Sequence, residues 1–190
     1  MKKLKFIYLL SATALSLGMI SCGGSSKPED TKEVAQEQND ANKDTKSAEK
    51  DADFVVNAAE INLEEIQLGQ LAQTKGMTAE VKDLGKMMET AHTKAMADLK
   101  NLASQKNIAI PTSLTENGQD AYKKLSDKTG TDFDKEYADM MVKGHKDAID
   151  KFEDASKNAN DAEIKAWANS MLPELNTHLE HATITKDKLK

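Results

Sequence analysis

The sequence contains no arginine, and all 26 of its basic residues are lysine. Three of these lysines lie in the first 21 residues, which hold no acid. Residues 22–190 therefore carry 23 lysines against 32 acidic residues, a net charge of −9. Proteins that bind nucleic acid neutralise phosphates with lysine and arginine clustered on one face. The composition therefore argues against a nucleic-acid partner and favours a surface that faces water.

Cysteine and aromatic residues are also scarce. Cys22 is the only cysteine, which excludes an intrachain disulfide, so core packing must stabilise the fold. Aromatic residues make up 4% and charged residues 31% of the 190 residues. This composition suits one helical domain and disfavours an aromatic-rich sheet protein. The chain also lacks a glycine-rich phosphate loop and a Ser-His-Asp arrangement with supporting glycines, which disfavours those enzyme classes.

Residues 1–21 are predicted to be a lipoprotein signal peptide. A lysine-rich start precedes an apolar run over residues 6–17, which is short for a membrane span of about 20 apolar residues. The tetrapeptide MISC at 19–22 resembles a lipobox, in which small residues admit a peptidase and the thiol accepts a diacylglycerol. Cleavage would leave a lipidated Cys22 as the first residue and anchor the chain to a membrane. The alternative is a plain secretory peptide that contains a cysteine.

The segment after Cys22 is predicted to be a tether. The two glycines at 23–24, with no acid directly after Cys22, favour the outer membrane, on its periplasmic face or at the cell surface. Residues 23–50 contain four apolar residues and no aromatic one, too few to offset the entropy of ordering. We therefore predict that residues 22–50 are the lipidated cysteine and a flexible tether, and that residues 51–190 are the folded domain.

Apolar residues recur every three or four positions from residue 51 onward, which is typical of amphipathic helices. The pattern predicts four long helices, near 51–75, 78–102, 132–152 and 160–182. Thr78 is expected to cap the second helix, and Asn160 with Glu163 to open the fourth. Pro173 should kink the fourth helix.

A long connection is predicted at residues 107–130, with a capping box at Ser113 and Glu116 and one short helix. About 24 residues can cross a bundle lengthwise, which would make the second and third long helices parallel. A single crossover of this kind is typical of ferritin-like folds. The expected fold is therefore an all-α four-helix bundle.

Four ionisable residues fall on the inward faces of these helices, one per helix: Glu65, His92, His145 and His178. Because helices rise about 1.5 Å per residue, Glu65 is expected about one turn from the level of His92, and His178 about one turn from the level of His145. If the second and third helices are parallel, His92 and His145 lie at similar depth and the four residues can converge. Burying an unpaired charge is costly, so their placement needs an explanation. Three interpretations remain open. They are a hydrogen-bonded polar layer that includes Tyr137, a site for a transition metal such as Zn, Cu or Fe, and a cleft for a small ligand.

Neighbouring residues refine the metal interpretation. Met88 and Met141 each precede a histidine of this set by four residues, and thioethers beside imidazoles suit Cu(I), although methionines at helical spacing more often fill a core. Glu89-x-x-His92 matches half of a di-iron motif, but no second copy follows, which disfavours a di-iron oxidase. The fourth histidine, His181, is expected at the boundary of its helix.

The helical segments resemble a family known as domain-of-unknown-function 4142 over about residues 52–187. The resemblance rests on Asp53-Phe54, Ala58-Ala59, Glu65-Ile66-x-Leu68-Gly69-x-Leu71-Ala72, His92, Phe133-Asp134-x-x-Tyr137, Met141-Val142-x-x-His145 and Leu172-Pro173-x-Leu175-x-x-His178. Members look like ferritin-like bundles and are often labelled outer membrane or exported proteins. The resemblance implies a fold and a location in the cell envelope, but it does not identify a reaction. Ala91 stands where members commonly have an aspartate that could orient the next histidine.

Together these observations predict a lipid-anchored, non-enzymatic helical bundle of the cell envelope, attached to the membrane through Cys22. Its buried cluster of Glu65, His92, His145 and His178 is the candidate transition-metal site. An envelope metalloenzyme, either an oxidase or a hydrolase, and a protein-interaction module are the alternative functions.

Overall fold

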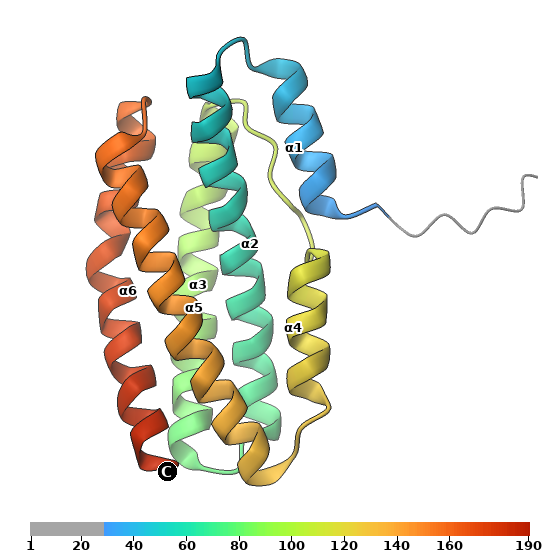
Figure 1. Cartoon of the computed structure of the whole chain (residues 1–190), viewed down its shortest axis with the longest axis vertical. Coiled ribbons are helices and arrows are strands. Elements are labelled where there is room, and N and C mark those ends of the chain that lie inside the picture. The colour runs from blue at the N-terminus through green and yellow to red at the C-terminus, as the bar shows by residue number, and fades with distance from the viewer. Residues whose placement is uncertain (1–28) are drawn as a thin grey trace, which may run out of the picture.

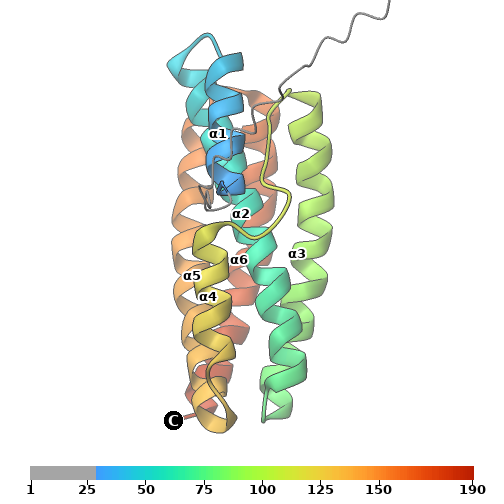
Figure 2. The same cartoon turned by 90° about the vertical axis from the view of Figure 1, so that its right-hand side faces the viewer.

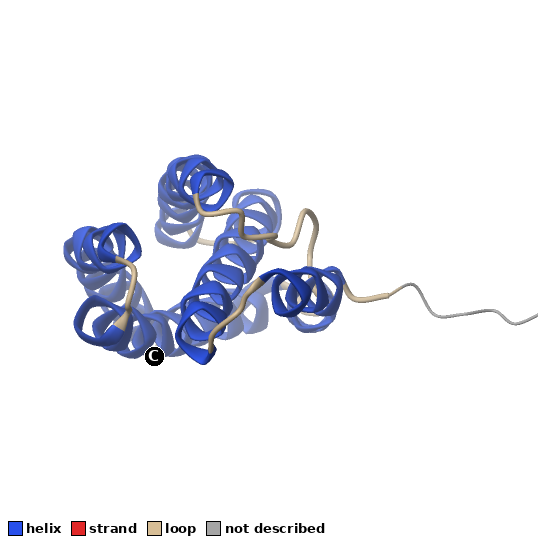
Figure 3. Cartoon of the chain, turned by 90° about the horizontal axis from the view of Figure 1, so that it is seen from above, coloured by secondary structure: helices blue, strands red, loops and turns tan. Residues whose placement is uncertain are grey.

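The computed structural model describes residues 29–190, so the predicted signal peptide and Cys22 lie outside the described residues. The described part forms six helices and no strand, which confirms the expected all-α class (Figure 3). The helices are α1 (Thr31–Asn42), α2 (Lys46–Lys75), α3 (Ala79–Gln105), α4 (Glu116–Ser126), α5 (Gly130–Asn158) and α6 (Ala162–Lys188). Over residues 29–190, none of these helices combines the length and the apolar character that a membrane crossing requires.

The four long helices α2, α3, α5 and α6 lie side by side (Figures 1 and 2). Helix α2 packs chiefly on α3, and α5 packs chiefly on α6, so two helical hairpins face each other. The connection after α3 and helix α4 together return along the length of the molecule (Figure 1). Helices α3 and α5 therefore run in the same direction.

Five of the six described helices begin at a side-chain cap, α5 being the exception, and two of the caps differ from expectation. The hydroxyl of Thr78 accepts a hydrogen bond from the Val81 N–H and caps α3, as predicted. Helix α4 is capped by Thr115 where the capping box placed Ser113, and α6 is capped by Asp161 at the residue after the expected Asn160. Side-chain oxygens at these positions satisfy amide groups that the first turn of a helix leaves free. Helix α6 continues through Pro173.

One buried aspartate in each hairpin forms hydrogen bonds to the turn of the other hairpin. Asp51, at the start of α2, accepts hydrogen bonds from the backbone N–H groups of Asn160 and Asp161 in the turn between α5 and α6. Asp134, at the start of α5, accepts from the N–H groups of Met77 and Thr78 in the turn between α2 and α3. These charge-assisted bonds hold both ends of the two hairpins in a fixed register.

The tether prediction is wrong for residues 31–50, which form α1 and the first turns of α2. Ala35 and Asn39 are buried where α1 packs on α2 and on the connection after α3. The Asn39 amide donates to the Ala109 carbonyl at 2.9 Å, and its oxygen accepts from the Ala109 N–H at 2.7 Å. These two hydrogen bonds replace the hydrogen bonds to water that the same groups would make in an unstructured tether.

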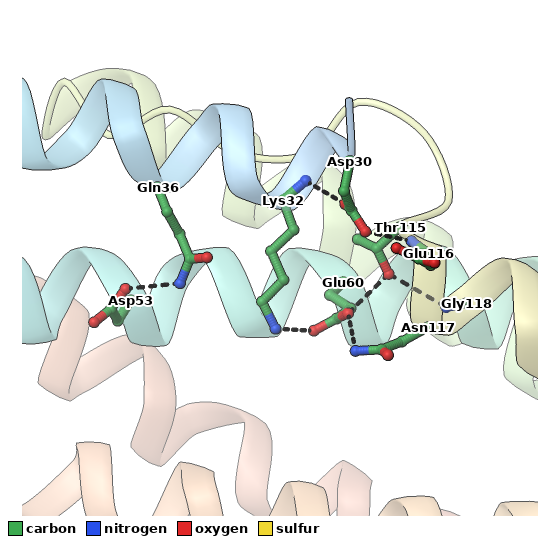
Figure 4. A network of polar contacts seen from close by, with 9 residues as sticks. All are labelled: Asp30, Lys32, Gln36, Asp53, Glu60, Thr115, Glu116, Asn117 and Gly118. Atoms are coloured by element: carbon green, nitrogen blue, oxygen red, sulfur yellow. Dashed lines mark hydrogen bonds and ion pairs between the residues drawn. The ribbon is translucent and has the colours of Figure 1, made fainter. Parts of the chain in front are cut away.

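Polar contacts also join the start of α1 to α2 and α4 (Figure 4). The Lys32 ammonium contacts the Glu60 carboxylate at 2.5 Å, and Glu60 also accepts from the Thr115 hydroxyl at 2.8 Å. Asp30 caps α1 and accepts from the backbone N–H of Glu116 at 2.6 Å. The low number of apolar residues in this segment did not predict α1, because α1 is held in place largely by side-chain hydrogen bonds.

The hydrophobic core consists of two clusters along the length of the long helices. One contains Val55, Leu99, Phe152 and Ile164, and the other contains Leu68, Met88, Phe133, Tyr137 and Ala182. On each long helix, the residue predicted as a metal ligand lies in sequence between the residues of one cluster and those of the other. A polar layer therefore divides the core.

We predict that Asn39→Ala lowers the protection of α1 amides in hydrogen exchange by about 1–2 kcal/mol, because the Ala109 backbone loses both partners. The matched control is Asn42→Ala, whose exposed side chain bonds only to the Gln38 carbonyl within α1. Equal protection in the two variants would show that α1 does not depend on this contact.

Candidate metal centre

Three of the predicted residues meet in the polar layer. His92 of α3, His145 of α5 and His178 of α6 are 4%, 1% and 4% exposed. One ring nitrogen from each lies within 4.8 Å of the other two. The ring centroids are 5.3–5.7 Å apart. Nitrogens this close can contact one ion through bonds of about 2.0–2.1 Å after small side-chain rotations.

The orientation of His92 is set by Asn62 of α2. The Asn62 amide nitrogen donates to the Ala58 carbonyl at 2.8 Å, which leaves its oxygen as an acceptor. That oxygen lies 2.9 Å from His92 Nδ1, so Nδ1 carries the proton and donates. The lone pair of His92 is consequently on Nε2, which is buried and has no hydrogen-bond partner among the described residues.

His145 is oriented in the same way by its own helix. Its Nδ1 donates to the Met141 backbone carbonyl at 2.8 Å, which places the lone pair on Nε2. His145 Nε2 and His178 Nδ1 are both buried, and neither has a hydrogen-bond partner within residues 29–190. Fixing one ring nitrogen by a hydrogen bond and leaving the other free is how proteins present imidazole to a metal.

Glu65 lies beside this group rather than within it. Its Oε1 is 3.8 Å from Nδ1 of His145, while its Oε2 is buried with no partner in the described part of the chain. Burial, and to a lesser degree nearby Glu64, raises the pKa of Glu65 well above its ordinary value. The structure thus brings three of the four predicted ligands together and places the fourth next to His145.

The histidines of the cluster are electrically neutral at ordinary pH. Burial lowers the pKa of His92 well below its usual range, and the neighbouring histidines add to this effect. Burial is also the main cause that lowers the pKa values of His145 and His178 to about 4. The contact between Glu65 and His145 is therefore not an ion pair. Neutral imidazoles are the form that binds metal ions.

This geometry disfavours a hydrogen-bonded polar layer, and it leaves no room for an organic ligand beside His92 and His178. A hydrogen-bonded polar layer would pair the facing nitrogens, yet these three atoms have no partner in the part of the chain that is described. A cleft for a small organic ligand needs hundreds of cubic ångströms. The cavity beside His92 and His178 has a volume of about 10 Å³, enough for one water molecule or ion.

The remaining candidate residues lie elsewhere. Glu89 accepts hydrogen bonds from Gln70 and Gln73 at the surface, away from His92. Met88 and Met141 are buried in the core cluster of Phe133, and Met141 meets His145 through its backbone oxygen. His181 is exposed. The contacts of Glu89 with Gln70 and Gln73 disfavour the di-iron pattern.

Asn62 is a residue of the candidate site that the sequence pattern missed. It is 3% exposed, whereas the neighbouring Ile61 is only partly buried. Its position three residues before Glu65 was an available signal, because residues three apart share one face of a helix. Asn62 also supplies what Ala91 lacks, since it orients His92 from the neighbouring helix.

The family model described as "Domain of unknown function (DUF4142)" matches residues 36–184. The match begins within α1, earlier than the limit of about 52 that the motifs indicated. The searches against curated proteins and against solved structures found no match to this chain.

We predict that Glu65→Gln makes the metal-free protein more stable at pH 8 but not at pH 4. In the unfolded chain this carboxyl loses its proton near pH 4.5, whereas the folded state retains it to higher pH. The free energy of unfolding therefore falls as pH rises above about 4.5 in the unaltered protein, and glutamine removes that dependence. Urea unfolding in the presence of chelator at both pH values measures the free energy of unfolding. The prediction would be contradicted if this free energy changed with pH in the same way in the variant and in the unaltered protein.

Proposed function

The chain belongs to the DUF4142 family, and we propose that it binds one transition-metal ion through His92, His145 and His178, with Glu65 at the side of the site. The family description leaves the activity open, so the proposal rests on the site. Three buried imidazole nitrogens with free lone pairs, all within 4.8 Å of one another, are the observation that carries it. A cation would satisfy all three at once.

The donor set indicates the class of ion. Neutral imidazoles with one carboxylate suit Zn²⁺, Cu or Fe, whereas Ca²⁺ and Mg²⁺ prefer an all-oxygen environment. Ionised Glu65 would offset part of the positive charge that the ion brings into the core. Asn62 and the Met141 carbonyl hold His92 and His145 in the required tautomers.

The arrangement of the helices supports this use. Each long helix contributes one residue, Glu65 from α2 and a histidine from each of α3, α5 and α6. We infer a ferritin-like four-helix bundle with one crossover, an architecture that builds metal sites from side chains on facing helices. The cavity beside His92 and His178 has room for an ion but not for an organic substrate.

The same proposal includes a lipid anchor at Cys22 that holds the domain at the outer membrane, in the periplasm or at the cell surface. The lipobox at 19–22 supports it. Because α1 begins at Thr31, eight residues separate Cys22 from the first helix. Eight extended residues reach at most about 28 Å, so the domain would stay near the membrane.

We predict that the unaltered chain, purified without chelator, contains close to one transition-metal ion per molecule, and that the His92→Ala/His145→Ala double variant contains almost none. Loss of a group that merely orients a ligand costs about 10- to 100-fold in affinity, so loss of two ligands should cost more. Elemental analysis and a chelator competition measure this. His181→Ala is the matched control, because that histidine is exposed. Equal metal content in all three proteins would refute the site.

A separate prediction concerns the anchor. Cys22→Ser should abolish incorporation of labelled fatty acid and leave the precursor unprocessed, because serine has no thiol to accept the diacylglycerol. Metabolic labelling and the mass of the purified protein report the result. Equal labelling of the serine variant would show that Cys22 is not the acceptor.

A further inference from the structure

A second cavity opens between α2 and α5 and reaches the edge of the metal centre. Its volume is about 330 Å³, which exceeds that of the cavity beside His92 and His178 more than tenfold. Its lining includes Glu60, Glu64, Glu65, Asn117, Gly144 and Asp147. Four of these six residues are acidic.

Glu65 connects this cavity to the histidines. It is 5% exposed and lines the cavity, and its Oε2 has no partner within the described residues. Its Oε1 lies 3.8 Å from Nδ1 of His145, on the imidazole ring whose other nitrogen, Nε2, has the free lone pair. Gly144 lies directly beside it, because a Cβ added there would come 3.4 Å from Glu65 Oε1. The absence of a side chain at Gly144 keeps this carboxyl accessible from the cavity.

The charges along the cavity attract cations. Glu60 is paired with Lys32 (Figure 4), but Glu64 and Asp147 form no ion pair in the described part of the chain. Lys151 is the opposing charge in the lining.

The other approach to the cluster offers no such path. The cavity of about 10 Å³ beside His92 and His178 is walled largely by apolar side chains, among them Phe152, Trp167 and Leu175. A volume of about 10 Å³ holds one water molecule, so a hydrated ion would have to shed its hydration shell before it could enter, although Asn62 and Glu174 also line this cavity.

We propose that the cavity between α2 and α5 is the passage by which a hydrated divalent transition-metal ion enters, with Glu65 binding the ion first and His145 receiving it next. The inference rests on the proposed metal site. Along this path a carboxylate oxygen of Glu65 replaces one water molecule bound to the ion, and an imidazole nitrogen of His145 then replaces another. The proton that neutral Glu65 carries is released to solvent as the carboxylate binds the ion.

The test measures the rate at which Co²⁺ alone binds to the full-length, metal-free chain at pH 8, followed by absorbance after rapid mixing. The Glu64→Gln/Asp147→Asn variant should load about three- to tenfold more slowly, because two attracting charges are gone. Lys151→Gln should load faster, because a repelling charge is gone. The matched control is Asp83→Asn/Asp98→Asn, which removes two exposed acids of α3 outside the cavity lining and should load at the unaltered rate.

A steric variant tests the passage independently of charge. Gly144→Ala should slow association and dissociation by the same factor and leave the Kd unchanged, because its Cβ would narrow the route while lying at ordinary contact distance, 3.4 Å, from Glu65 Oε1. Helix content by circular dichroism shows whether each variant is folded. Equal loading rates in all folded variants, or slowing by the α3 control as well, would overturn the passage while leaving the site intact. Failure of the unaltered chain to bind Co²⁺ would overturn both.

Discussion

Three imidazole nitrogens with free lone pairs face one another in the middle of this protein, and leaving them without partners lowers the stability of the fold. A buried polar atom without a partner costs about 1–3 kcal/mol, and the polar layer contains several. Apolar side chains at the same positions would make a continuous core from the two clusters on either side. A cation at the proposed site would convert the same lone pairs into bonds, so the polar layer would then stabilise the fold instead of weakening it.

Keeping three histidines from three helices within 4.8 Å requires that the helices do not slide. The two hairpins meet through fewer close contacts than those within each hairpin, so packing alone sets their register weakly. The buried aspartates supply the missing constraint. Asp51 binds the turn of one hairpin at one end of the molecule, and Asp134 binds the turn of the other hairpin at the opposite end (Figure 1). Each bond set joins a charged carboxylate to helix-start N–H groups, which is a strong and directional contact.

The region of α1 and α4 connects the outer face of α2 to the passage proposed for the ion. Glu60 is shared between Lys32 of α1, Thr115 at the start of α4 and the cavity lining (Figure 4). Neutralising Glu60 in this way leaves Glu64 and Asp147 as the acids free to act on a cation. The same contacts tie the crossover to α2, so the segment once expected to be a tether stabilises the wall of the cavity.

The sequence by itself determined the all-α class and the approximate positions of the long helices, because a 3.6-residue period is a local property of the chain. The spacing of the apolar residues also showed that one ionisable residue on each long helix points inward, namely Glu65, His92, His145 and His178. Only the tertiary structure decided how these residues meet, because the distance between helices depends on contacts far apart in the chain. The role of Asn62 follows from its contact with His92, 30 residues away, and α1 folds through the bond of Asn39 to Ala109, 70 residues away. No local pattern encodes either contact, and each becomes visible only once the helices are packed.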